Sequence, residues 1–204
     1  MNEGRGGQIS QAEGDDELLR ARFYALLSNL LTKPPTPETI EMLRSIEGDD
    51  SPMGKALGAL SAAARKATPE DIEEEFTKLF YGVGAGGEVL PYASHYLTGL
   101  LYDKPLAVLR GEMSRLGLQG DPKATEPEDH IATVLEVMHT LILGHRGPEG
   151  DGCQQSFFRA HLLSWAPMFF TDLEEAENAS LYVPVGTIGT LLMEIEEQAF
   201  DMAA

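Results

Sequence analysis

Apolar residues recur at intervals of three and four through nearly the whole chain, and this spacing limits what the chain can fold into. In 15–33, for example, the sequence DDELLRARFYALLSNLLTK places its leucines and Phe23 on one helical face. Similar patterns occupy 36–46, 55–67, 68–80, 91–118 (with a kink near Pro105), 125–145, 156–177 and 180–200. The β-branched clusters are short and broken by glycine or proline. The pattern predicts an all-α protein, a single bundle of seven or eight helices.

Length and helix-end signals suggest one domain. The chain has 204 residues, which suits a single substantial core better than two. Residues 1–14 are glycine-rich and polar, and we expect a disordered N-terminal tail there, followed by one helical domain over 15–204. Thr36 before Pro37, and Thr68 before Pro69, are typical of helix N-caps.

Charge narrows the classes of partner. The chain carries 33 acidic and 15 basic residues, a formal net charge of -18. Such a field repels nucleic acid and anionic lipid surfaces and attracts basic partners, although it also fits a purely solubilising role. Cys153 is the single cysteine, so an intramolecular disulfide and a cysteine-rich zinc site are excluded. No signal peptide and no apolar run of membrane-spanning length is evident, so we expect a cytoplasmic protein without a membrane span.

A glycine-rich segment, YGVGAGGEV, contains Gly82-x-Gly84-x-x-Gly87, the letters of the dinucleotide-binding fingerprint. That fingerprint works only between a strand and a helix of a parallel sheet. Here the preceding EEEFTKLF is helical, so we reject a dinucleotide site. Two interpretations stay open: a disordered connector, or a flexible loop beside a binding surface.

A second segment, EPEDHIATVLEVM, begins a predicted helix. Glu126, Glu128 and Asp129 fall in its expected first turn, where acids are favoured by the helix dipole. His130 follows directly, and a histidine beside an acid can titrate near neutral pH or hold a fixed hydrogen bond. A plain helix start and a functional site both fit these residues.

Three segments together resemble the TorD/DmsD/NarJ-type redox-enzyme maturation chaperones, the cytoplasmic partners of molybdoenzymes exported by the twin-arginine route. FTKLFYG followed by PYASHY is similar to the family's Leu-Phe-x-Gly and Pro-aromatic-x-Ser-x-Tyr. EPEDHIATVLEVM is similar to its Glu-Pro-x-Asp-His segment, and FFRAHLLSWAPMFF to its His-Leu-x-x-Trp-x-Pro-x-Phe helix. The resemblance covers nearly all of the chain after about residue 17. Two departures are Val134, where the family often has glutamate, and Tyr92, where tryptophan is common.

The resemblance implies an all-helical, non-catalytic chaperone that binds the twin-arginine signal peptide, and the apo-form, of a molybdopterin-dependent oxidoreductase before export. An arginine pair and an apolar stretch call for carboxylates beside apolar groups. The residues implied for peptide binding are Phe76, Leu79, Phe80, Pro91, Tyr92, Ser94, Tyr96, Glu128, Asp129 and His130. Each of the three on 76–80 can equally be ordinary core.

Alternatives remain at this point. An adaptor could recognise a folded partner subunit without a signal peptide, and a hydrolase using Asp129 and His130 ranks last because no third triad member is evident. Some relatives are reported to bind guanine nucleotides, but no Gly-Lys-Ser/Thr phosphate loop exists here, so we expect no cofactor, and no metal. The client and the oligomeric state, including a domain-swapped homodimer, stay open.

Overall fold

The computed structural model describes residues 4–82, 86–120, 123–144 and 153–202, with side chains from residue 14 onward. Within these ranges the chain is helical and has no strand, which confirms the all-α prediction. The helices are α1 (Gly4–Thr32), α2 (Pro37–Arg44), α3 (Pro52–Lys66), α4 (Pro69–Phe80), α5 (Ala93–Thr98), α6 (Lys104–Arg115), α7 (Ile131–Ile142), α8 (Cys153–His161), α9 (Ala166–Glu175) and α10 (Tyr182–Met202).

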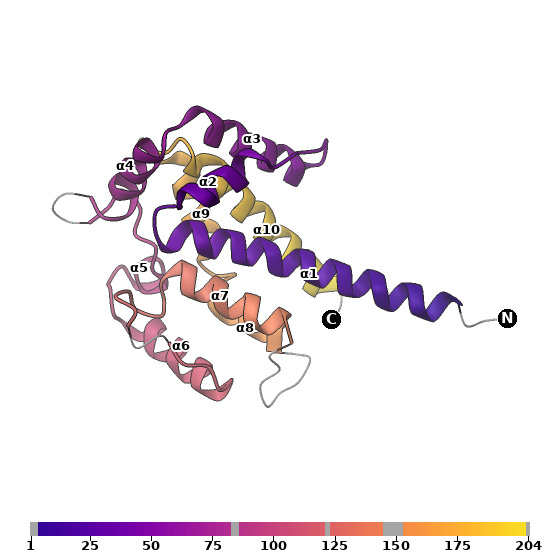
Figure 1. The fold of residues 1–204 in the computed structure, drawn as a ribbon. Coiled ribbons are helices and arrows are strands. Elements are labelled where there is room, and N and C mark those ends of the chain that lie inside the picture. Colours follow the sequence, from indigo (N-terminus) through magenta and orange to yellow (C-terminus); the bar gives the residue numbers. More distant parts are fainter. Residues whose placement is uncertain (1–3, 83–85, 121–122, 145–152, 203–204) are drawn as a thin grey trace.

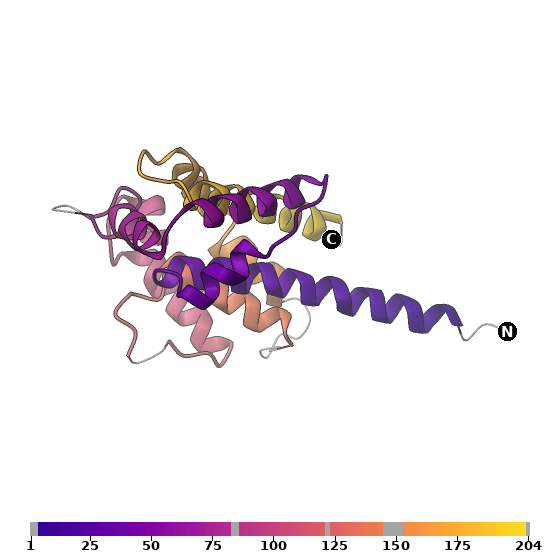
Figure 2. The same cartoon turned by 45° about the horizontal axis from the view of Figure 1, so that its top comes forward.

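The long helix α1 crosses the body of the molecule and packs along α7, while α10 packs against α9 and α3 (Figure 1). In both views the N-terminal part of α1 projects beyond the other helices (Figure 2). The helix α6 lies at one edge and packs mainly against α5. It therefore borders solvent on a larger part of its surface than the central helices do.

The described residues form ten helices, more than the seven or eight expected, because two predicted helices are each divided. Gly99, at φ 74°, ends α5 in the left-handed conformation, and Pro105 stands in the first turn of α6. Pro167 likewise stands in the first turn of α9, and the indole N–H of Trp165 donates to the carbonyl of His161 at the end of α8 (2.6 Å). Turns that are only a few residues long escape a periodicity argument.

The helix starts read from sequence are partly confirmed. Thr36 accepts a hydrogen bond from the backbone N–H of Thr39, and Thr68 and Asp71 form a reciprocal capping box on α4. The helix α1 begins at Gly4, inside the 1–14 segment expected to be a disordered tail. The order of that segment in solution stays a prediction.

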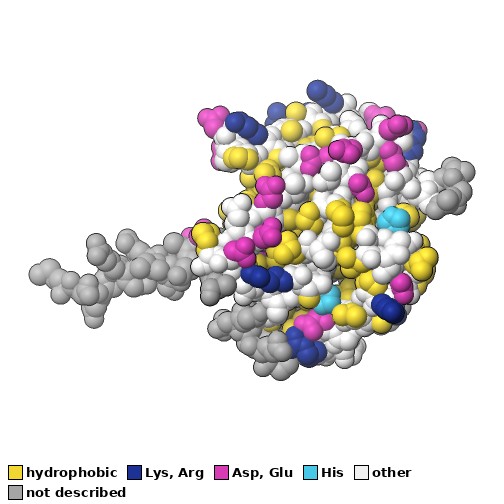
Figure 3. Space-filling model, turned by 180° about the vertical axis from the view of Figure 1, so that it is seen from behind, with side chains coloured by type: hydrophobic (Ala, Val, Ile, Leu, Met, Phe, Trp, Pro, Cys, Tyr) yellow, Lys and Arg dark blue, Asp and Glu magenta, His cyan; other side chains and the backbone are white. Residues whose placement is uncertain are grey.

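One continuous hydrophobic core joins nearly all the helices, and its largest fully buried side chains include Trp165, Tyr24 and Tyr182. Three acids are buried among the described residues: Glu75, Asp129 and Glu196. Glu196 on α10 is fully buried and accepts hydrogen bonds from Arg20 (2.6 and 2.8 Å) and Tyr24 (3.1 Å) of α1. The rear face carries acidic side chains dispersed among hydrophobic patches (Figure 3). None of the described helices combines the length and apolarity needed to cross a membrane.

The glycine-rich segment follows α4, and residues 83–85 of the predicted flexible loop lie outside the described residues. Gly82 and Gly86 have positive φ angles of 41° and 118°. A Cβ on Gly87 would lie 2.2 Å from the carbonyl oxygen of Leu79. These three glycines are therefore required by backbone geometry, because the returning chain runs directly over the end of α4. Flexibility of the loop stays a prediction.

Candidate functional site

The two sequence motifs that carry most of the implied site meet in space. The backbone N–H of Ala93 donates to the carbonyl of Asp129 (3.0 Å), and that of Ile131 donates to the carbonyl of Pro91 (2.8 Å). These bonds form an isolated antiparallel bridge between Tyr92 and His130. Residues 91–94 and 128–131 thus form one unit, even though the sequence separates them by more than thirty positions.

Asp129 holds this unit together. Its Oδ2 accepts hydrogen bonds from the backbone N–H of Ser94 (2.9 Å) and from the Ser94 hydroxyl, so the carboxylate caps the start of α5. Asp129 is 1% exposed, and its Oδ1 has no hydrogen-bond partner among the described residues. Its observed partners make it a positioning group for α5. The expected placement of Glu126, Glu128 and Asp129 in the first turn of a helix is wrong, because α7 begins only at Ile131.

His130 is the N-cap of α7. Its Nδ1 accepts a hydrogen bond from the backbone N–H of Ala132 (3.2 Å), and its ring packs at 76° to the ring of Tyr92 with a centroid distance of 5.3 Å. Burial lowers the pKa of His130 to about 4, although nearby Glu126 and Asp129 act in the opposite direction. The imidazole is neutral at physiological pH. Of the two roles considered from sequence, this environment suits the fixed hydrogen bond.

The implied residues on α4 lie in the core. Phe76, Leu79 and Phe80 are all buried, and Phe76 and Phe80 contact each other (4.8 Å between ring centroids) as well as Tyr182 (5.9 and 5.5 Å). As placed, these side chains offer a peptide almost no surface. Their role in peptide binding stays a prediction, and direct contact with a peptide would require α4 or α10 to move.

Tyr96 lies apart from that aromatic group. Its hydroxyl donates to Asp172 of α9 (2.7 Å), and its ring packs 5.8 Å from Trp165. The contact ties the short helix α5 to α9. Tyr96 therefore braces the scaffold that carries Ser94 and the Tyr92 bridge.

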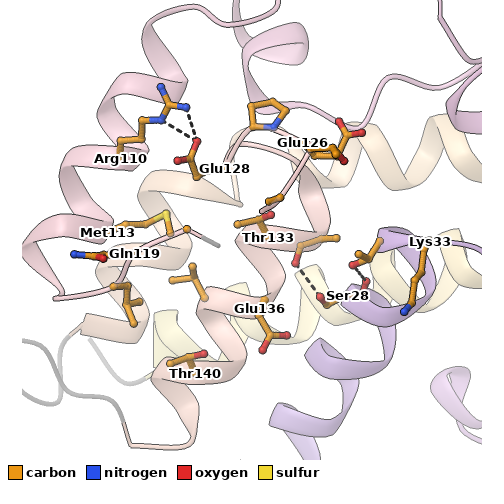
Figure 4. Close-up of a pocket in the computed structure, with 18 of the residues that line it drawn as sticks. Ser28, Lys33, Arg110, Met113, Gln119, Glu126, Glu128, Thr133, Glu136 and Thr140 are labelled. Atoms are coloured by element: carbon orange, nitrogen blue, oxygen red, sulfur yellow. Dashed lines mark hydrogen bonds and ion pairs between the residues drawn. The ribbon is translucent and has the colours of Figure 1, made fainter. Parts of the chain in front are cut away.

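A cleft of about 830 Å³ with both polar and apolar lining lies beside the paired motifs, between α1, α6, α7 and the segment that precedes α7. Its walls combine carboxylates, amides and hydroxyls with a few apolar side chains (Figure 4). The lining residues are Ser28, Asn29, Thr32, Lys33, Tyr102, Arg110, Met113, Leu118, Gln119, Gly120, Ala124, Thr125, Glu126, Pro127, Glu128, Ala132, Thr133, Glu136, Val137 and Thr140.

Three glutamates line this cleft in different electrostatic settings. Glu128 accepts from Nε (2.8 Å) and Nη2 (2.7 Å) of Arg110, and the hydrogen bond from Arg110 holds the pKa of Glu128 below its usual value. Glu126 instead accepts from the hydroxyls of Tyr92 (2.5 Å) and Tyr81 (3.5 Å). The exposed Glu136 has no hydrogen bond or ion pair within the described part of the chain. Figure 4 shows Glu128 turned toward Arg110, and Glu126 lying apart from that pair.

A second hollow lies on the other side of α6. It has a volume of about 290 Å³ and is mostly apolar, lined by Leu97, Pro105, Val108, Leu109, Val134 and Trp165 together with Ala93, Thr98, Lys104, Ala160 and His161. Val134, the position where the family often has glutamate, is buried here, while Glu136 faces the cleft. The helix α6 thus lines two depressions: the cleft, with its three glutamates, on one side and this apolar groove on the other.

The structure brings together only part of the implied site. Pro91, Tyr92, Ser94, Asp129 and His130 form the bridged unit, and Glu128 reaches the cleft. The α4 residues and Tyr96 lie elsewhere. Sequence reasoning left Glu126 and Glu136 out of the site, although both stand within the quoted EPEDHIATVLEVM segment. What it lacked was the knowledge of which acids are paired by other parts of the chain.

Among the described residues, no group of three histidine, cysteine, aspartate or glutamate side chains is placed to hold a metal ion. The polar groups that line the cleft include carboxylates, amides and hydroxyls. No nucleophile–base pair is evident among the contacts of Asp129 and His130, whose hydrogen bonds go to backbone groups and to Ser94.

Comparison with known proteins identifies relatives along most of the chain. Residues 46–171 match the family described as nitrate reductase delta subunit. The chaperone protein TorD of Vibrio atlanticus is 30% identical over 201 residues, covering 88% of this chain and 93% of the relative. TorD of Vibrio parahaemolyticus is 26% identical over 191 residues, covering 83% and 88%.

A solved structure shares the fold. It is described as a redox enzyme maturation protein from Archaeoglobus fulgidus and aligns with a TM-score of 0.58 at 20% identity, covering 86% of this chain and 93% of that one. The names of the relatives bear out the expectation of a chaperone and not an enzyme. With a family model matching more than half of its residues and a TorD relative 30% identical over most of its length, the chain belongs to the TorD/NarJ family of redox-enzyme maturation chaperones.

Proposed function

We propose that this protein is a client-specific chaperone of a molybdopterin-dependent oxidoreductase. It binds the twin-arginine signal peptide, and the apo-form, of its client in the cytoplasm and delays export until the cofactor is inserted. The support is twofold: kinship with proteins named TorD chaperones, and a cleft whose chemistry suits such a peptide.

The observation that carries the proposal is the presence of acids without a basic partner in a partly apolar cleft. Glu126 and Glu136 both line it, and neither forms an ion pair within the described residues. Unpaired carboxylates are unfavourable to gather in one place unless an incoming cation offsets them. An arginine pair is such a cation, and its guanidinium groups bind carboxylates through two parallel hydrogen bonds.

The apolar stretch of the same peptide also finds suitable surface. Met113, Leu118 and Val137 contribute apolar lining to the cleft, and the groove beyond α6 is mostly apolar. A helical or extended segment laid against α6 therefore meets carboxylates on one side and hydrocarbon on the other. Carboxylates and apolar side chains on the two sides of α6 suit a peptide that carries both an arginine pair and a hydrophobic run.

The test is calorimetric titration of the purified protein with twin-arginine leader peptides encoded in its own genome, at low and moderate salt. We expect saturable binding to one leader, weakened by salt and by replacement of the arginine pair with lysines. Binding of a folded partner subunit with no affinity for any leader would favour the adaptor alternative and reject this proposal.

A further inference from the structure

Two tyrosines, Tyr81 and Tyr92, reach the carboxylate of Glu126, and a third, Tyr102, lines the same cleft as Glu126. No role has been assigned to them as a group. Tyr81 follows the end of α4, Tyr92 precedes α5, and Tyr102 lies in the turn before α6. We call Tyr81, Tyr92 and Tyr102 the tyrosine cluster. The phenols of Tyr81 and Tyr102 lie close enough to that of Tyr92 to contribute to raising its pKa. Three separate segments thus bring their phenols near one another, and two of these phenols reach the Glu126 carboxylate.

The carboxylate of Glu126 is held in place but not neutralised. Tyr92 donates to its Oε2 (2.5 Å), and Tyr81 lies 3.5 Å from its Oε1. Burial, followed by the hydrogen bond to Glu126, raises the pKa of Tyr92, so this phenol stays a neutral donor. Each carboxylate oxygen has a second lone pair, so Glu126 can accept two further hydrogen bonds.

The surrounding rings supply the other half of a cation site. Tyr81 and Tyr102 are 53% and 71% exposed, far more than most aromatic side chains of this protein. Tyr102 also has a positive φ of 60°, and within the described residues no other residue except glycine does. Aromatic faces attract cations, and planar guanidinium groups stack on them better than ammonium groups. A strained conformation that presents an exposed ring to the cleft that Glu126 also lines fits a binding role.

The neighbouring acid, Glu128, is a weaker candidate than Glu126 for binding a cation. Glu128 lies two positions away, but its charge is already offset by Arg110. An incoming cation therefore gains more from Glu126 than from Glu128. The exposed phenols, the fixed carboxylate and the cleft below them are in place before any ligand arrives, so little ordering is needed on binding.

We propose that Glu126 and the tyrosine cluster form a subsite that takes the guanidinium group of one arginine of the client peptide and discriminates it from lysine. The inference rests on the proposed function for the identity of the ligand. Glu126 receives the two guanidinium N–H groups, and the rings cover the guanidinium plane. Lysine forms neither the paired hydrogen bonds nor the stack, and it binds more weakly at this position.

The test uses small probes and the full chain, so that it does not depend on finding the client. Acetyl-Arg-Arg-amide and acetyl-Lys-Lys-amide are titrated into protein carrying ¹³C-labelled tyrosine rings, and the ring signals are followed by NMR. We expect the arginine probe to shift the signals of the tyrosine cluster saturably and the lysine probe to bind several-fold more weakly. Tyr24 and Tyr182, which are buried, serve as internal references.

Two variants decide the outcome. Glu126→Gln is expected to weaken the arginine probe by about tenfold, the loss of one charge-assisted interaction. Glu194→Gln is the matched control, because it removes the charge of an exposed carboxylate on α10 that does not line the cleft. It should leave probe affinity unchanged. Equal affinity for both probes, or an unchanged affinity in folded Glu126→Gln, overturns the subsite.

A further variant protects the test against misfolding. Tyr102→Asn removes an exposed ring and keeps a residue that tolerates positive φ, so it should fold normally and lose preference for arginine over lysine. Leader titrations separate the two proposals. If the probes bind at the tyrosine cluster but no leader binds, the subsite stands and the proposed function fails. If a leader binds equally well to Glu126→Gln, the proposed function stands and the subsite fails.

Discussion

Glu75 and Glu126 are both carboxylates beside aromatic clusters, yet they lie in opposite settings. Glu75, on α4 beside Phe76, is buried and accepts three backbone N–H groups at the start of α10, from Ser180 (2.7 Å), Leu181 (3.1 Å) and Tyr182 (2.9 Å). Glu126 accepts from phenols at the edge of an open cleft. The chain itself supplies the hydrogen-bond partners of Glu75, which we call the closed acid. Glu126, the open acid, can still accept hydrogen bonds from a ligand.

The difference shows why acid and aromatic composition alone does not identify a binding site. The closed acid satisfies the N–H groups that every helix start leaves unpaired, so its removal should affect stability. The open acid satisfies little in the free protein, so its removal should affect affinity. Variants at each position test whether one acid acts on stability and the other on affinity.

The largest effect is expected at the closed acid. Glu75→Ala removes three hydrogen bonds to a charged group and leaves buried N–H groups unpaired, which should lower the free energy of unfolding by roughly 4 kcal/mol. Urea denaturation measures the loss. The control is Glu73→Ala, an exposed position on the same helix, which should unfold like the wild type. Similar stability in both variants would mean that Glu75 does not hold α10 to α4.

The next effect concerns His130, the buried N-cap of α7. Its pKa of about 4 when folded is below its ordinary value of 6.5, so the unfolded state binds more protons between these values. Stability should therefore fall as the pH drops from 6.5 to 4, by about 3 kcal/mol in total. His130→Asn keeps an N-cap acceptor and removes the titration.

Thermal or urea unfolding of wild type and His130→Asn across this pH range is the measurement. The difference between the two proteins isolates the histidine, because the carboxylates are common to both. A difference that does not change with pH would show that His130 is not buried as described.

A smaller effect is expected at Glu128, whose charge is already paired with Arg110. Arg110→Gln releases Glu128, so affinity for an arginine-pair leader should rise by about three- to fivefold, while stability stays unchanged because the ion pair is largely exposed. Arg159→Gln is the matched control, since it breaks an exposed pair with Asp201 that joins α8 and α10. If both variants bind the leader alike, Arg110 does not compete with the ligand.

The smallest effect is expected at Glu136, an open acid that no tyrosine holds. Glu136→Gln should weaken leader binding by about threefold and make the affinity less dependent on salt. Thermal stability should not change. Glu194→Gln on α10 removes an equally exposed charge away from the cleft lining and controls for net charge. Equal effects in the two variants would point to a general field effect instead of a site.

Much of the fold follows from local rules. The 3–4 spacing predicts the helices because each helical face repeats within one turn, and the caps at Thr36 and Thr68 depend on residues three positions away. The divided helices escape prediction because Gly99 ends α5, and Trp165 precedes the start of α9, within continuous apolar patterns. The family resemblance is also a property of the sequence, and the relatives confirm it.

The site is less predictable. The bridged motifs, 91–94 with 128–131, were both identified from sequence, but the partners of each acid were not. Phe76, Leu79 and Phe80 resemble a binding surface in sequence and are buried in the structure. An apolar stripe on a helix has the same spacing whether it faces a core or a groove.

The sequence by itself thus determined the all-α class, several helix ends, the acidic charge and the family. Only the tertiary structure decided which acids are closed and which are open. Glu75 meets backbone groups 105 to 107 positions away, whereas Glu126 meets a phenol 34 positions away at the edge of a cleft. Helix formation depends on neighbours within one turn, but the pairing of a charge depends on which distant segments pack around it.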